Sequence, residues 1–304
     1  MLRSVQRPEA RCQTISLMSF NQSRQGLIHT LLHYLRAINA ENIKEWKIEF
    51  TYKPDFVRQF IEPFVYLFPY FLYGFALLGG RYSEHLRSIT GISDMVAYTF
   101  IGYLFIGFLN TACWAMGFSL RKEQWFGTLE TIFVAPVPRW VYVAGMALHS
   151  TCHQGLIMLI QAVAIATFFA IVLHMSGIFI ALLIVLLMLL GLYGLGIIVA
   201  GLTIALKQWW VVSEALSTLI VVVTPIAYPL AVLPFVLRKL SMFLPTTYGI
   251  IGVRHFLLGE ELAIALPTIF LRLSLILVVW LTFGMIVFLV MDRYGRKRGS
   301  LSIY

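Results

Sequence analysis

The sequence predicts an all-α integral membrane protein with six transmembrane helices, an N-terminal amphipathic interfacial helix, and re-entrant short helices between spans five and six. Hydrophobic residues make up 60% of the chain, charged residues only 12%, and the mean hydropathy is +0.84. Soluble domains have about 25% charged residues. Six apolar stretches approach the roughly 20 residues that a spanning helix needs. Four prolines also lie within the 21 positions from 225 to 245.

The chain is expected to begin with a disordered cytoplasmic tail at residues 1–24, which contain Arg, Gln and Ser and no apolar core of signal-peptide length. An amphipathic segment follows at residues 25–55. Apolar residues recur there at spacings of three and four, with His29, His33 and Arg36 opposite. This pattern fits a helix lying in the membrane interface, or a helix packed on a soluble partner.

Residues 56–292 form the expected six-span domain. Its first apolar stretch is short unless Phe56–Ile61 extend it, and its third is long enough to begin in the interface. The expected spans are residues 63–79, 95–120, 141–173, 178–206, 211–237 and 263–291.

A polar loop at residues 120–140 separates the second and third spans. It contains Arg121-Lys122-Glu123-Gln124-Trp125-Phe126-Gly127-Thr128-Leu129-Glu130 and, after four further residues, Ala135-Pro136-Val137-Pro138-Arg139-Trp140. Gly127 gives the backbone freedom to turn, and Pro136 with Pro138 stops a helix. Because the flanking stretches are apolar enough to lie within the membrane, this charged loop is expected to act outside the membrane.

Prolines interrupt the fifth span. Pro225 and Pro229 are followed by Pro234 and Pro245. Proline removes a helix donor, and unpaired backbone is costly in lipid. Residues 225–262 are therefore expected to form short helices that dip into the bundle near the outer surface without crossing it.

The distribution of Lys and Arg predicts that both termini are cytoplasmic. The inner side would hold nine before the first span, three in the 120–140 loop, Lys207, and four in a basic tail at residues 293–304. That makes 17, against five in the outer loops. The net charge of +9 then reflects orientation and contact with anionic lipids, and no nucleic-acid-binding module is expected.

Aromatic residues crowd the first two spans at too many depths for one interfacial belt. With nearby amide and hydroxyl groups they would line a path for a lipid-like or aromatic substrate, although plain helix packing explains any single ring equally well. The expected pathway and gate residues are Tyr66, Tyr70, Tyr103, Asn110, Tyr228, Pro229 and Tyr248.

Several kinds of chemistry are not expected. The chain has no Gly-x-x-x-x-Gly-Lys-Ser/Thr motif to cradle ATP phosphates, no mid-span acidic residue for proton coupling, and no convincing catalytic pair. His149, Cys152 and His153 share a helix face as metal ligands would, but no carboxylate lies nearby in sequence. We therefore expect no catalytic residue and no metal in this chain.

Two motifs resemble a known family, the permeases of ABC-2 type transporters. Charged Arg-Lys-Glu followed by Gly127-Thr128-Leu129-Glu130 and a Pro-containing stop is similar to the family's cytoplasmic coupling segment. Leu244-Pro245-Thr246-Thr247-Tyr248 and Val253-Arg254-His255-Phe256-Leu257-Leu258-Gly259 are similar to its outer re-entrant segment. The resemblance covers about residues 25–295, and the missing Leu-Gly-x-x-Trp signature of the carbohydrate branch favours the drug or lipid branch.

The resemblance implies one half of an exporter pathway in the plasma or inner membrane, for a lipid-like, drug-like or glycan-lipid substrate. It implies two copies of a separate ABC ATPase, which would hold ATP and Mg, and a second permease chain in a homodimer or heterodimer. Membrane lipids are further partners. The implied coupling residues are Glu123, Trp125, Gly127, Thr128, Leu129, Glu130, Phe133, Pro136 and Arg139. The alternatives are a secondary carrier or channel, or a membrane-embedded enzyme of lipid or glycan assembly.

Overall fold

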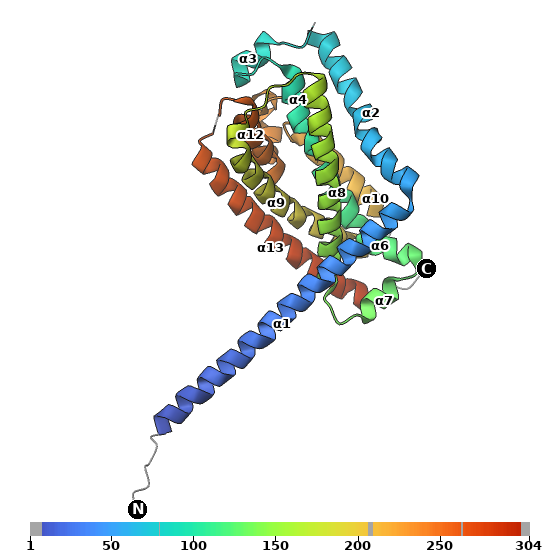
Figure 1. The fold of residues 1–304 in the computed structure, drawn as a ribbon, viewed down its shortest axis with the longest axis vertical. Helices are drawn as coiled ribbons and strands as arrows, with labels where there is room; N and C mark the ends of the chain where they lie inside the picture. The colour runs from blue at the N-terminus through green and yellow to red at the C-terminus, as the bar shows by residue number, and fades with distance from the viewer. Residues whose placement is uncertain (1–7, 79, 206–208, 263, 299–304) are drawn as a thin grey trace, which may run out of the picture.

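The protein is a helical bundle with a long N-terminal arm (Figure 1). The computed structural model describes residues 8–78, 80–205, 209–262 and 264–298. Within these ranges there is no strand, and the β-type pairing is an isolated bridge between Tyr82 and Asp94. The all-α prediction is confirmed for this part of the chain.

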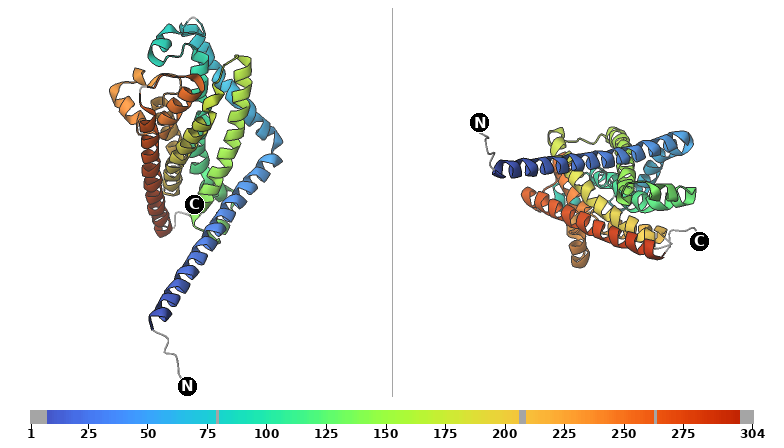
Figure 2. Two further views of the ribbon diagram at one scale, coloured as in Figure 1. Left: turned by 60° about the vertical axis from the view of Figure 1, so that its left-hand side comes forward. Right: turned by 90° about the horizontal axis from the view of Figure 1, so that it is seen from below.

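The arm is helix α1 (Pro8–Thr51), which projects beyond the bundle and lies against α8 (Arg139–Phe168) with its C-terminal half (Figures 1 and 2). The sequence predicted a disordered tail up to residue 24, and the structure differs by starting the helix at Pro8. Proline suits a first helical position, and no further proline or glycine interrupts the chain before Gly26. The chain turns sharply at Tyr52 into α2 (Lys53–Leu78), whose first turn holds Pro54.

The bundle is built around α9 (Ile178–Ala205), which packs along α13 (Leu266–Arg298). A Cβ on Gly194 of α9 would lie 2.3 Å from the carbonyl carbon of Trp280, and one on Gly284 would lie 2.4 Å from the oxygen of Gly194. These two glycines therefore allow the two backbones to touch, as small residues do between membrane helices.

Four stretches of the described chain are long and apolar enough to cross a membrane: Met95–Phe126, Arg139–Phe168, Met175–Ile204 and Leu266–Gly295. The first is a composite of α4 (Met95–Leu104), α5 (Ile106–Asn110), the π-helix η1 (Thr111–Ala115) and α6 (Met116–Phe126). Helices α2 and α10 (Trp209–Val223) lie where the other two spans were expected. Helix α10 has only 15 residues because the Pro225 break ends it, so the six-span count stays a prediction.

Short helices follow α10, as predicted for residues 225–262: η3 (Leu230–Val232), α11 (Phe235–Ser241) and α12 (Pro245–Leu258). The fully buried Arg254 holds this segment in place. Its guanidinium donates to the Tyr98 carbonyl at 3.0 and 2.8 Å, to the Pro225 carbonyl at 2.8 Å, and to the Ile226 carbonyl. Arg254 thus satisfies the carbonyls of Pro225 and Ile226, which the broken helix leaves free, and links them to Tyr98 of α4. Whether the segment dips into a membrane stays a prediction.

The two ends of the bundle differ. Helix α3 (Glu84–Thr90) and α12 lie at one end, whereas α7 (Leu129–Val134) and the C-terminal part of α13 lie at the other (Figures 1 and 2). The 120–140 loop and the C-terminal segment therefore share one end, as the charge distribution requires. Residues 293–298 of the expected basic tail continue α13, and residues 299–304 lie outside the described ranges.

Candidate functional site

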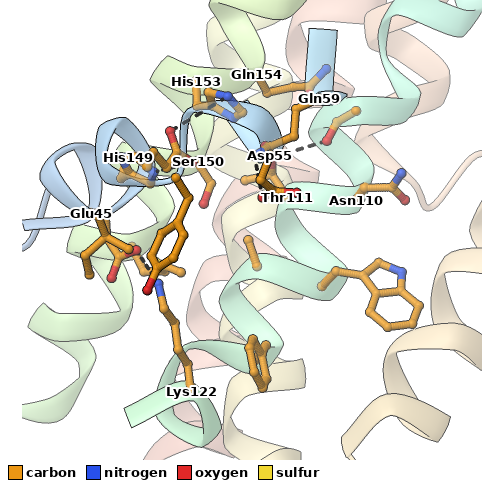
Figure 3. Close-up of a pocket in the computed structure, with 18 of the residues that line it drawn as sticks. Glu45, Asp55, Gln59, Asn110, Thr111, Lys122, His149, Ser150, His153 and Gln154 are labelled. Carbon is orange, nitrogen blue, oxygen red and sulfur yellow. Dashed lines mark hydrogen bonds and ion pairs between the residues drawn. The ribbon is translucent and has the colours of Figure 1, made fainter. Parts of the chain in front are cut away.

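A partly open cavity of about 780 Å³, called the chamber below, lies between the α1–α2 elbow and a wall formed by α5, η1, α6 and α8 (Figure 3). A second cavity of about 250 Å³ shares Gly107, Asn110 and Gln154 with it and extends to Tyr103 and Gln161. Ligand pockets commonly enclose about 300–1,000 Å³. The chamber's polar and charged lining residues are Glu45, Glu49, Asp55, Arg58, Gln59, Asn110, Thr111, Lys122, His149, Ser150, His153 and Gln154.

A π-helical turn shapes the chamber wall. Thr111, Trp114 and Ala115 of η1 line the chamber. Isolated π-turns inside α-helices often occur at functional sites, because they shift the register of the side chains around a bound group. The apolar sequence of this span carries no signal for the turn, and sequence reasoning missed it.

Three carboxylates of α1 lie where the arm meets the bundle. Glu41, Glu45 and Glu49 recur every four residues and so share one helix face. The ammonium of Lys44 lies 2.7 Å from Glu41 and 3.3 Å from Glu45, and Lys122 of α6 pairs with Glu45. This acidic stripe was visible in the sequence, but Lys122, the partner of Glu45 on α6, lies 77 positions away.

Lys44 occupies the centre of the acidic cluster. The carboxylates of Glu41, Glu45 and Glu123 could together ligate a metal ion by their spacing. Lys44 already contacts all three, with 2.7 Å to Glu123. Burial would lower the pKa of Lys44, but hydrogen bonds to Glu123 and Glu41 outweigh burial and raise it, so the ammonium stays charged. The lysine thus supplies the positive charge that a metal would bring.

Glu123 connects the 120–140 loop to this cluster. Its side chain is buried and accepts hydrogen bonds from Lys44 at 2.7 Å, from the Tyr142 hydroxyl at 2.8 Å, and from the Thr128 hydroxyl. The resemblance implied a coupling role for Glu123, which stays a prediction. The carboxylate turns inward because its cationic partner comes from α1 of the same chain.

Leu129 also turns inward. It is 7% exposed and packs in a second core with Met116, Leu120, Tyr142 and Phe288. The resemblance implied a coupling role for Leu129, and that role stays a prediction. Burying this apolar side chain in the core of its own chain stabilises a short helix that could not otherwise persist. Helix α7 itself is present as the short helix that was expected.

The remaining loop residues divide into exposed and structural groups. Trp125 and Phe126 are 71% and 70% exposed, and Pro136 is exposed. Gly127 has φ of +72° and ends α6, which confirms its role as the turning point. Arg139 pairs with Asp292 of α13. The side chains of Glu130 and Phe133 are not among those that the structure describes.

The structure brings a carboxylate to the two histidines on α8. Glu49 Oε1 lies 3.2 Å from His149 Nε2, and Glu49 Oε2 lies 3.8 Å from His153 Nε2. The imidazole rings are parallel, with centroids 6.2 Å apart. Cys152, which was considered with them, is exposed. Glu49, His149 and His153 all line the chamber, and Figure 3 labels the two histidines.

The expected pathway residues only partly converge. Tyr103 and Asn110 line the second cavity, and Tyr228 lines a separate apolar cavity of about 420 Å³ that shares Ile106 with it. Pro229 caps η3. Tyr248 is 2% exposed in the main core and receives a hydrogen bond from Arg272, so it lines none of these three cavities. The side chains of Tyr66 and Tyr70 lie outside the described set.

The chain is similar to a known protein family. A family model described as ABC-2 type transporter matches residues 43–258. The matched range includes the chamber, the 120–140 loop and the short helices after α10. A search of curated proteins finds no match.

Proposed function

Because the chain belongs to the ABC-2 type transporter family and is a membrane transporter subunit of ABC type, we propose that it is the permease of an ATP-driven exporter. Its cargo would be a lipid-like or drug-like molecule that passes through the chamber. The energy would come from ATP hydrolysed with Mg on a separate ATPase.

One observation carries this proposal: two adjacent residues of α6 join the chamber to the loop. Lys122 lines the chamber and pairs with Glu45, while Glu123 binds Thr128 of the loop and Lys44 of the arm. A displacement of the loop therefore moves the turn of α6 that forms part of the chamber wall. Rigid helices that pack together and can switch between two distinct arrangements transmit such displacements.

The docking surface for the ATPase would consist of the exposed apolar side chains at the same end. Trp125 and Phe126, which precede the short helix α7, and Val134, its last residue, are all exposed. Aromatic anchors commonly dominate the energy of such interfaces. Trp125 is one of the coupling residues that the resemblance implied, whereas Leu129 supports the loop from inside.

The complete transporter would contain two ATPase copies and two permease chains. Each permease would have six spans, with α2 and α10 completing the four long apolar stretches, and both termini in the cytoplasm. Alternating access would follow from closure of the ATPase pair, which pushes the two loops and opens the chambers outward.

The proposal is tested by purifying the tagged full chain from its native membranes and assaying for a bound ATPase subunit. The wild-type chain is expected to retain an ATPase, and Phe126→Ala is expected to retain at least about tenfold less. Phe179→Ala is the matched control, because Phe179 is 82% exposed on α9 away from the loop. If no ATPase accompanies the wild-type chain, or if both variants retain it equally, the proposed coupling role is wrong.

A further inference from the structure

The charges that line the chamber do not balance. The chamber and the second cavity together contain four carboxylates, Glu45, Glu49, Asp55 and Glu62, and two basic side chains, Lys122 and Arg58. With neutral histidines the lining has a net charge of −2. A cavity with low-dielectric walls concentrates such a charge and raises the local concentration of cations.

Neither basic side chain offers a free positive charge to a cargo. Lys122 pairs with Glu45. Arg58 pairs with Asp55 at 2.9 Å and also with Glu62, so two carboxylates surround one guanidinium. An anionic cargo would therefore have to displace existing ion pairs.

Glu49 is the carboxylate best placed to receive a cation. Its side chain is 18% exposed and no Lys or Arg pairs with it among the described residues. Its Oε2 is buried without a hydrogen-bond partner in this part of the chain, because the 3.8 Å to His153 Nε2 is too long for a hydrogen bond. A buried carboxylate oxygen without a donor is costly, and a ligand that supplies positive charge removes that cost.

The rest of the wall suits an apolar, aromatic body. Tyr52, Trp114 and Phe118 line the chamber beside Ile48 and Met146. Aromatic faces attract cations and also stack on other rings. A volume of about 780 Å³ admits a molecule of drug size.

We propose that the cargo site of this permease selects amphipathic organic cations, with Glu49 receiving the positive group and Trp114 and Phe118 packing on the apolar part. The inference rests on the proposed function, because it takes the chamber as the place where cargo binds. It goes further by naming the charge of the cargo and the residue that binds the charged group.

The test uses three probes of similar shape and different charge: tetraphenylphosphonium, neutral triphenylphosphine oxide and tetraphenylborate. Their dissociation constants are measured by equilibrium dialysis on the purified full chain, without ATP. The wild-type chain is expected to bind the phosphonium at least about tenfold more tightly than the borate. Glu49→Gln is expected to weaken phosphonium binding about tenfold and to leave the neutral probe unchanged.

Two further variants make the result decisive. Glu84→Gln removes a carboxylate that is 87% exposed on α3 outside the chamber, and it should change nothing. Asp55→Asn should reduce phosphonium affinity by a smaller factor, since Asp55 is 57% exposed. If Glu49→Gln weakens the binding of all three probes equally, the effect of that change is structural. In that case Asp55→Asn must weaken the binding of the phosphonium alone, and the inference is overturned if it does not.

Equal binding of phosphonium and borate by the wild-type chain also overturns the inference. Because no ATPase is present, the outcome is separate from that of the proposed function. If the wild-type chain binds the phosphonium selectively but shows no ATP-driven transport, only the proposed function is contradicted.

Discussion

Replacing Leu129 by Ala tests whether the loop is anchored from inside. Leu129 is 7% exposed and packs against Leu120, Tyr142 and Phe288. Leu→Ala changes in cores cost about 2–5 kcal/mol, depending on how far the cavity collapses. Helix α7 is at the edge of its core and has six residues, so the surroundings can relax, and we expect about 2–3 kcal/mol.

The assay is hydrogen exchange of the α7 amides in the detergent-purified chain, which reports the free energy of local opening. A loss of 2–3 kcal/mol corresponds to about 30–150-fold faster exchange. Phe126→Ala, at a position 70% exposed, should leave exchange within about twofold. Unchanged exchange in Leu129→Ala, or an equal effect of both changes, would refute the inward anchoring of the loop.

Four other predictions concern two glycines, the buried Arg254 and the topology. Gly102→Ala should strongly lower the thermal stability of the purified chain, because the added Cβ would lie 2.0 Å from the Ile226 oxygen and 2.5 Å from Arg254 Nη2. Gly155→Ala should instead stabilise helix α8 by up to about 1 kcal/mol, because a Cβ at that position would have nothing within 4 Å. Arg254→Lys should cost more than about 2 kcal/mol in chemical unfolding, because one ammonium cannot reach all three carbonyls; stability equal to wild type would contradict this. Introduced cysteines should react from the cytoplasmic side at 121–139 and from the outside at 238–260, and the reverse labelling would invalidate the charge-based orientation.

The helices and their breaks could be predicted from local signals. Apolar length located the four long apolar stretches, and Pro225 marked where α10 ends. Gly127 was correctly expected to let the chain turn, because positive φ is a property of a single residue. The start of α1 at Pro8 was missed, since a polar helix that projects from the bundle lacks an apolar pattern to reveal it.

The inward direction of the loop side chains could not be predicted. Whether Glu123 and Leu129 face a partner or their own chain depends on α1 and α13, which lie far away in sequence. A sequence motif specifies residue types, but it does not specify which neighbouring residues will form their hydrogen bonds and apolar contacts. Glu49 was missed for the same reason, because its histidine partners lie 100 or more positions along the chain.

The connection from loop to chamber is tested most directly by transport per hydrolysed ATP in vesicles that contain the permease and its ATPase. Glu123→Gln removes the charge that binds Lys44 but keeps the size of the side chain. Because Phe126 is untouched, the ATPase should still bind and hydrolyse ATP, while the number of molecules transported per ATP falls at least about tenfold. An unchanged ratio at equal membrane abundance would contradict the claim that Glu123 transmits loop movement to the chamber.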